Sequence, residues 1–131
     1  MTGPASTSAY QMQGLGGSIT PQGSGNVLLI LSGTITNTSG VAGVGALYQL
    51  SYGTGAAPAN GAALAGTQVG AAQEYTNPAT VTAADVNVPF SIQFLITGLT
   101  KGTAYWLDLA AKAVSATGVA FSNLSLSAAE V

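Results

Sequence analysis

The sequence predicts an all-β protein, folded as an antiparallel sandwich or jelly roll of about six to eight strands. Three observations predict this fold class. Apolar and polar residues alternate in several segments, turn residues separate these segments about every 8–12 residues, and no segment gives a convincing helix. A chain of 131 residues is long enough for one such domain and too short for two with separate cores.

The first clear strand is expected at Asn26–Thr36, where alternate apolar residues begin with Val27 and Leu29 on one face. Leu28 and Ile30 lie on the other face, which predicts that this strand is covered on both sides. The remaining strands are expected at 44–52, 67–75, 90–97, 105–114 and 118–129.

Two of these segments have a less regular pattern. Residues 104–117 also satisfy a helical face, but the segment follows a turn and opens with Thr-Ala-Tyr-Trp, so a strand is preferred. In the last strand the apolar phase shifts between Phe121 and Leu124, which predicts a β-bulge. Long loops are expected at Gly53–Gly66, which is rich in Gly, Ala and Pro, and at Thr76–Asn87, which contains Pro78.

The domain organisation is a short extended N-terminal arm, residues 1–17, followed by one β-sandwich domain, residues 18–131. The arm is rich in Gly, Ser and Ala and has little periodicity. Within it Tyr10, Met12 and Leu15 alternate, a pattern that allows part of the arm to dock as an edge strand.

Charge is scarce, since 47% of the residues are hydrophobic and only 5% are charged. An average soluble domain carries about 25% charged residues. Two lysines and no arginine cannot form the basic face that a nucleic acid or an anionic membrane surface requires. No stretch approaches the roughly 18 consecutive apolar residues of a membrane-spanning helix. A surface so poor in charge predicts that much of it is buried in an oligomer or on a lattice, or is covered by Ser, Thr, Asn and Gln.

No enzyme chemistry is predicted. The chain has no His and no Cys, which removes the usual general base and the strongest nucleophile. The acids Glu74, Asp85, Asp108 and Glu130 are scattered, so we expect them to cap turns or face solvent, and we expect no catalytic site, cofactor or metal site. A calcium ion on a ring of carboxylates between subunits stays open as an alternative.

The aromatic residues Tyr48, Tyr52, Tyr105 and Trp106 allow two interpretations. They could form a platform on which sugars stack, as in many carbohydrate-binding sandwiches, or they could anchor the core and an interface. Because polar partners are sparse near them, the second interpretation is preferred.

Several segments resemble a pattern found in the jelly-roll domains of bacteriophage virion proteins, which are similar to tumour-necrosis-factor and C1q heads. These segments are Leu50-Ser51-Tyr52-Gly53-Thr54-Gly55, Gly66-Thr67-Gln68-Val69-Gly70, Pro89-Phe90-Ser91, Ile96-Thr97-Gly98-Leu99-Thr100-Lys101-Gly102-Thr103-Ala104-Tyr105-Trp106-Leu107-Asp108 and Asn123-Leu124-Ser125-Leu126-Ser127-Ala128-Ala129-Glu130. The turn before Tyr105 also resembles the tyrosine corner of fibronectin type III domains, so a fibronectin type III-like sandwich is the alternative fold.

The resemblance implies a capsid cement (decoration) protein, located on the outer capsid surface of the virion. It would stabilise the assembled shell by bridging subunits of the major capsid protein. The resemblance also implies self-assembly, as a homotrimer rather than a homodimer, and an arm that orders on a neighbouring subunit. The alternative is a receptor-binding head domain of a phage head fibre or tail fibre. The residues expected to contact partners are Tyr10, Met12, Leu15, Tyr48, Tyr52 and Trp106.

Overall fold

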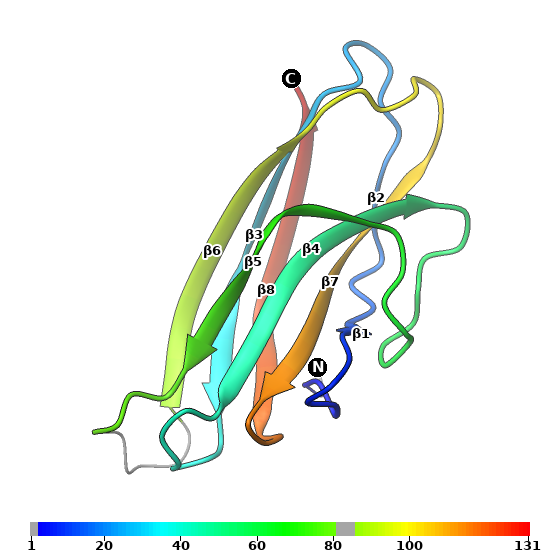
Figure 1. The fold of residues 1–131 in the computed structure, drawn as a ribbon. Helices are drawn as coiled ribbons and strands as arrows, with labels where there is room; N and C mark the ends of the chain where they lie inside the picture. The colour runs from blue at the N-terminus through cyan, green and yellow to red at the C-terminus, as the bar shows by residue number, and fades with distance from the viewer. Residues whose placement is uncertain (1–2, 81–85) are drawn as a thin grey trace.

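The fold is an all-β sandwich of two antiparallel sheets, as the sequence predicts (Figure 1). The computed structural model describes residues 3–80 and 86–131. Within these residues it contains strands and no helix, and therefore no helical segment that could span a membrane. The strands are β1 (Gln11–Met12), β2 (Gly17–Ile19), β3 (Val27–Asn37), β4 (Gly45–Thr54), β5 (Thr67–Thr76), β6 (Val86–Ile96), β7 (Tyr105–Val114) and β8 (Val119–Glu130).

The strand order is that of a jelly roll. Sheet A has the order β1-β7-β4-β5, with β2 also paired to β7, and sheet B has the order β6-β3-β8. The pairs β4–β5, β3–β6 and β2–β7 are nested like the two arms of one long hairpin that has been rolled up. In the fibronectin type III-like alternative the last two strands are neighbours. Here β8 pairs with β3 instead of β7.

The core lies between the sheets and follows the period-two pattern of the strands. In β3 the side chains of Val27, Leu29, Leu31 and Ile35 are buried. They belong to one cluster with buried residues of β6, β7 and β8, among them Leu107 of β7. The expectation that this strand is covered on both sides is wrong, because no described strand lies over Leu28 and Ile30, which are half-buried. The strand covered on both faces is β7, whose residues from Tyr105 to Ala111 are all buried.

Three local assignments have a clear outcome. The predicted bulge in β8 is confirmed, since pairing with β3 shifts between Ser32 and Thr34 and Asn123 has a φ of 51°. Residues 105–114 form a strand and not a helix. The predicted loop 76–87 is too long at its C-terminal end, because β6 already begins at Val86 and includes Pro89. Proline is tolerated there since β6 is an edge strand, where a missing N–H need not break a ladder.

Candidate binding surfaces

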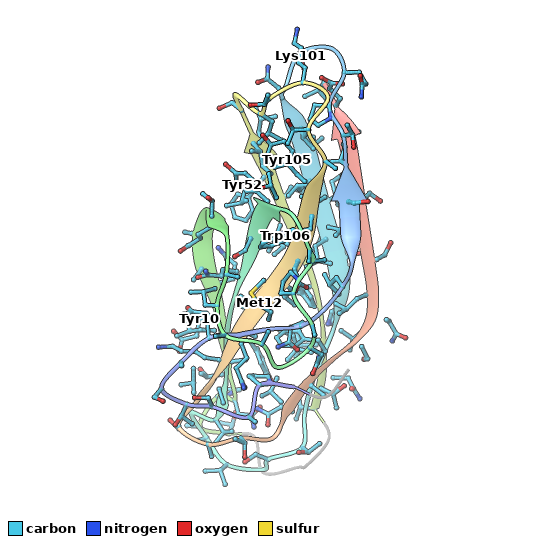
Figure 2. All side chains as sticks on the ribbon, turned by 90° about the vertical axis from the view of Figure 1, so that its right-hand side faces the viewer. Tyr10, Met12, Tyr52, Lys101, Tyr105 and Trp106 are labelled. Carbon is cyan, nitrogen blue, oxygen red and sulfur yellow. The ribbon has the colours of Figure 1, made fainter. Side chains whose placement is uncertain are left out.

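A layer formed by the N-terminal arm and the loop 55–66 covers the outer face of β7 and β4 in sheet A, and leaves most of β5 exposed. Met12 is fully buried and packs against Trp106 and Ala110 of β7 (Figure 2). The backbone N–H of Met12 donates to the carbonyl of Ala62 at 2.9 Å, and the N–H of Gly61 donates to the carbonyl of Met12 at 2.8 Å. The arm and the loop therefore interlock and together shield the face of β7 that points away from the core.

Trp106 anchors this layer. Its indole Nε1–H donates to the carbonyl of Thr54 at 3.2 Å, and its side chain is only 6% exposed. A Cβ atom added at Gly53 or Gly66 would overlap the indole ring. Gly53 in β4 and Gly66 at the end of the loop are therefore required so that the backbone can approach the ring closely.

Asp108 fastens the arm to sheet A. Its carboxylate is 1% exposed and accepts three backbone N–H groups, from Gly14 at 3.0 Å and from Leu15 and Leu109 at 2.8 Å each. Burial raises the pKa of this carboxyl above its ordinary value, against the lowering effect of the three hydrogen bonds. Its register partner Ser51 has a buried Oγ that lacks a hydrogen-bond partner among the described residues, and so does Gln13 Oε1. The site holds the backbone of the arm in place.

Glu130 performs the same task at the other end of the sandwich, where it caps the loop 22–25, in line with the expectation that these acids cap turns or face solvent. Its carboxylate accepts the N–H groups of Gln22, Gly23 and Gly25 at 2.8 Å each. These hydrogen bonds hold the pKa of Glu130 down at about 2. The Gly/Ser-rich segment Gln22-Gly23-Ser24-Gly25 predicts a loop whose backbone N–H groups need an acceptor. Nothing in the sequence indicates that this acceptor is Glu130.

The residues expected to contact partners do not gather on one surface. Tyr48 lies in the core, with its ring centroid 5.2 Å from Phe90 and 5.7 Å from Phe121. Tyr52 is half-buried, edge-to-face with Tyr105 at 5.9 Å.

The other four belong to the layer over sheet A or to its border. Met12 and Trp106 are buried beneath it, and Leu15 is half-buried against the core. The ring of Tyr10 is half-buried, and the Lys112 Nζ lies 5.4 Å from its centroid. Of the predicted set, only Tyr10, Leu15 and Tyr52 keep a partly exposed side chain. Asp85, one of the four acids, lies outside the described residues.

The outer face of sheet B carries no charged side chain among the described residues. Its β3 residues are flanked on both sides by uncharged side chains of β6 and β8. The rows across the sheet are Leu95–Leu28–Ala129, Gln93–Ile30–Ser127, Ser91–Ser32–Ser125, Pro89–Thr34–Ser122 and Asn87–Thr36–Ala120. One end of this face is therefore apolar, with Leu95 54% exposed, and the rest is lined by hydroxyl and amide groups.

A small open notch lies where the edges of β5 and β6 meet. Its volume is about 220 Å³, and it is lined by Tyr52, Thr67–Gly70 and Leu95–Thr97. The lining contains no charged side chain, so the notch suits a neutral polar group and not an ion.

Among the described residues no cluster of three or more His, Cys, Asp or Glu side chains forms a metal-binding set. Comparison of the chain with protein-family models, with curated proteins and with solved structures gives no match.

Proposed function

We propose that this chain is a non-catalytic cement (decoration) protein of a bacteriophage capsid, which binds the assembled shell through the outer face of sheet B. The observation that carries the proposal is the charge-free surface of β6, β3 and β8, which nothing in the described chain covers. A protein that binds the assembled shell and not its free subunits stabilises the shell by mass action.

The chemistry of this face fits a protein partner. The buried centres of protein interfaces are depleted in charged residues, and this face has none among its described residues. The apolar end around Leu28 and Leu95 supplies area to bury, and the serine and threonine rows supply hydrogen-bond donors and acceptors. Contacts of this kind depend little on salt, because no ion pairs are screened.

The arm has a smaller part in this proposal than the resemblance implies. Its backbone is hydrogen-bonded to Asp108, to the loop 55–66 and to β7, where the Ala113 N–H donates to the Ser6 carbonyl at 2.8 Å. To reach a neighbouring subunit the arm would have to leave all of these partners. The proposal therefore assigns docking to sheet B and keeps the arm on its own chain.

The test compares two matched variants in binding to assembled phage shells that lack this chain. Gln93→Lys places a charge on the outer face of sheet B, whereas Gln73→Lys places it on β5 of sheet A; both glutamines are exposed and lie on edge strands. Gln93→Lys is expected to reduce shell occupancy about tenfold or more by burying an unpaired charge. Gln73→Lys is expected to bind like the unaltered chain. Equal occupancy of the two variants would contradict the docking face.

A receptor-binding head of a head fibre or tail fibre is the second candidate, and the notch beside Tyr52 favours it. Tyr52 offers an aromatic ring, and Thr67, Gln68 and Thr97 offer neutral hydrogen-bonding groups, as sugar recognition requires. A glycan array with the unaltered chain and with Gln68→Ala tests it. Binding that is lost in Gln68→Ala, together with density for the chain at fibre tips, would replace the cement proposal.

A further inference from the structure

The two sheets have four edges, and three of them carry features that hinder pairing with another strand. The β6 edge contains Pro89. The β5 edge is bent where its pairing with β4 shifts between Tyr48 and Leu50, near Gly70 with a φ of 67°. The edge formed by β1 and β2 consists of two short pieces separated by Gly14 and Gly16, both with positive φ. Prolines, bulges and short strands are the usual protection of an exposed edge.

The second half of β8 has no such protection. From Ser125 to Glu130 it pairs in regular register with β3 on one side, and no described strand pairs with its other side. In Figure 2, β8 forms the right-hand border of the molecule. In a rolled hairpin of eight strands this is the side on which the first strand would pair, whereas β1 lies beside β7. Gly3 of the arm packs against the beginning of β8, at Val119 and Ala120, and Gly17 packs on the inward side chain of Leu126, so the backbone edge of the second half of β8 stays unpaired among the described residues.

We propose that the segment Leu124–Glu130 pairs antiparallel with the same segment of a second copy of this chain, about a twofold axis at Ser127. The result is one continuous six-stranded sheet in the order β6-β3-β8-β8-β3-β6. Adding a strand to an exposed edge is a common mode of association, and closed homodimers are built on such twofold contacts.

A second copy fits this edge because the segment is complementary to itself. About an axis at Ser127, the two serines face each other, Leu126 faces Ala128 and Leu124 faces Glu130 of the other copy. No like charges meet across the pair, and the Glu130 carboxylate is already held by the loop 22–25. The inward side chains Leu124 and Leu126, partly buried in one chain, extend the core of the other.

The backbone geometry identifies a residue that tests the pairing directly. The N–H of Val131 donates to the carbonyl of Asn26 at 2.9 Å, so Val131 points toward β3. Because backbone groups alternate along a strand, Ala129 also points toward β3, whereas Ala128 points to the free edge. Ala128→Pro therefore removes one N–H from the free edge and none from the ladder with β3, as Pro89 illustrates on β6.

The pairing concerns the isolated chain, so its test needs no capsid. Sedimentation velocity and light scattering over a concentration series should show a dimer for the unaltered chain. Ala128→Pro should raise the dissociation constant about tenfold or more, with an unchanged far-UV spectrum as evidence of folding. A monomer at every concentration, or a dimer that survives Ala128→Pro, would overturn the pairing without bearing on binding of the shell by sheet B.

A second pair of variants separates edge pairing from packing of two sheet faces. Ser127→Lys and Ser91→Lys introduce the same charge on the same exposed face, on β8 and on β6. In edge pairing, only the lysines at 127 meet across the axis, so Ser127→Lys should weaken the dimer about tenfold and Ser91→Lys should leave it unchanged. Equal weakening by both would show that faces pack on each other, and would rule out pairing through β8.

Discussion

The carboxylate of Asp108 accepts the backbone N–H of Leu15 at 2.8 Å, across 93 positions of the sequence. A strand in the middle of sheet A thus holds the N-terminal arm, and the arm in turn covers Trp106 and Ala110. The outer faces of the two sheets consequently differ. The arm and the loop 55–66 cover β7 and β4 of sheet A, whereas the outer face of sheet B is uncovered and free of charge among the described residues.

Asp108→Asn should loosen the arm. An asparagine presents an NH₂ group to some of the three N–H donors that the carboxylate now accepts, so buried donors lose their partners. We expect the free energy of unfolding to fall by about 1–3 kcal/mol in denaturant titrations. Amide exchange at Gly14 and Leu15 should accelerate. Glu74→Gln, an exposed acid in β5, is the control and should change neither. Unchanged exchange at both amides would contradict the role of Asp108.

Glu130 should make the stability of the chain sensitive to acid. Its pKa is about 2 in the folded protein and 4.5 ordinarily, so its stabilising effect is complete above pH 4.5 and is lost as the pH falls toward 2. Glu130→Gln removes this titration. The difference in unfolding free energy between the unaltered chain and this variant should therefore shrink as the pH falls from about 5 to about 2. The two pKa values of Glu130 set this pH range. The pKa of Asp108 shifts in the opposite direction, but Asp108 is present in both proteins, so its contribution cancels in the difference. A difference that is constant with pH would contradict the prediction.

Gly66→Ala should displace Trp106. Gly66 and Gly55 both have positive φ, 78° and 82°, but only a Cβ at Gly66 would overlap the indole. Gly55→Ala has open space and controls for the strain of the backbone. We expect Gly66→Ala to cost about 1–3 kcal/mol more than Gly55→Ala. The fluorescence of the single tryptophan should shift to the red in Gly66→Ala only, as the ring becomes exposed. Identical spectra for the two variants would contradict close packing on the ring.

Tyr105→Phe should remove one hydrogen bond and leave the packing intact. The Tyr105 hydroxyl accepts the N–H of Thr100 at 3.0 Å and fixes the turn that precedes β7. We expect a loss of about 1 kcal/mol in thermal or chemical unfolding. Tyr52→Phe alters the other ring of the same edge-to-face pair, and the Tyr52 hydroxyl has no hydrogen bond within residues 3–80 and 86–131, so it should cost less. A larger loss of stability for Tyr52→Phe than for Tyr105→Phe would contradict the role of the hydrogen bond from Thr100 to Tyr105.

The strands were predictable because local alternation encodes which side chains face the core. The pattern of Val27, Leu29 and Leu31 is visible in the sequence, and the shift of phase after Phe121 marked the bulge. The start of β6 was not predicted, because proline usually ends a strand. Pro89 is tolerated in β6 because β6 lies at the edge of its sheet. The turn before Tyr105 indicated a tyrosine corner, and the hydroxyl of Tyr105 does bond back to Thr100.

The binding surfaces were much less predictable. Which strand of a sandwich is covered on both faces depends on where distant segments lie. The apolar residues on both faces of β3 therefore predicted burial on both sides, but it is β7 that is buried in this way. Met12 and Trp106 were expected to contact partners, but both are buried, and the loop over Trp106 approaches it closely only because of two glycines. The charge-free face of sheet B emerges only from the register of three strands that are far apart in the sequence.

The central claim is that the outer face of sheet B docks on an assembled shell. A reconstruction of the decorated particle by electron cryo-microscopy tests it most directly, because the orientation of the chain can be read from the density. We predict that β6, β3 and β8 face the shell, and that the layer of the arm and the loop 55–66 faces away from it. Density in which that layer contacts the shell, or a shell without any density for the chain, would contradict the claim.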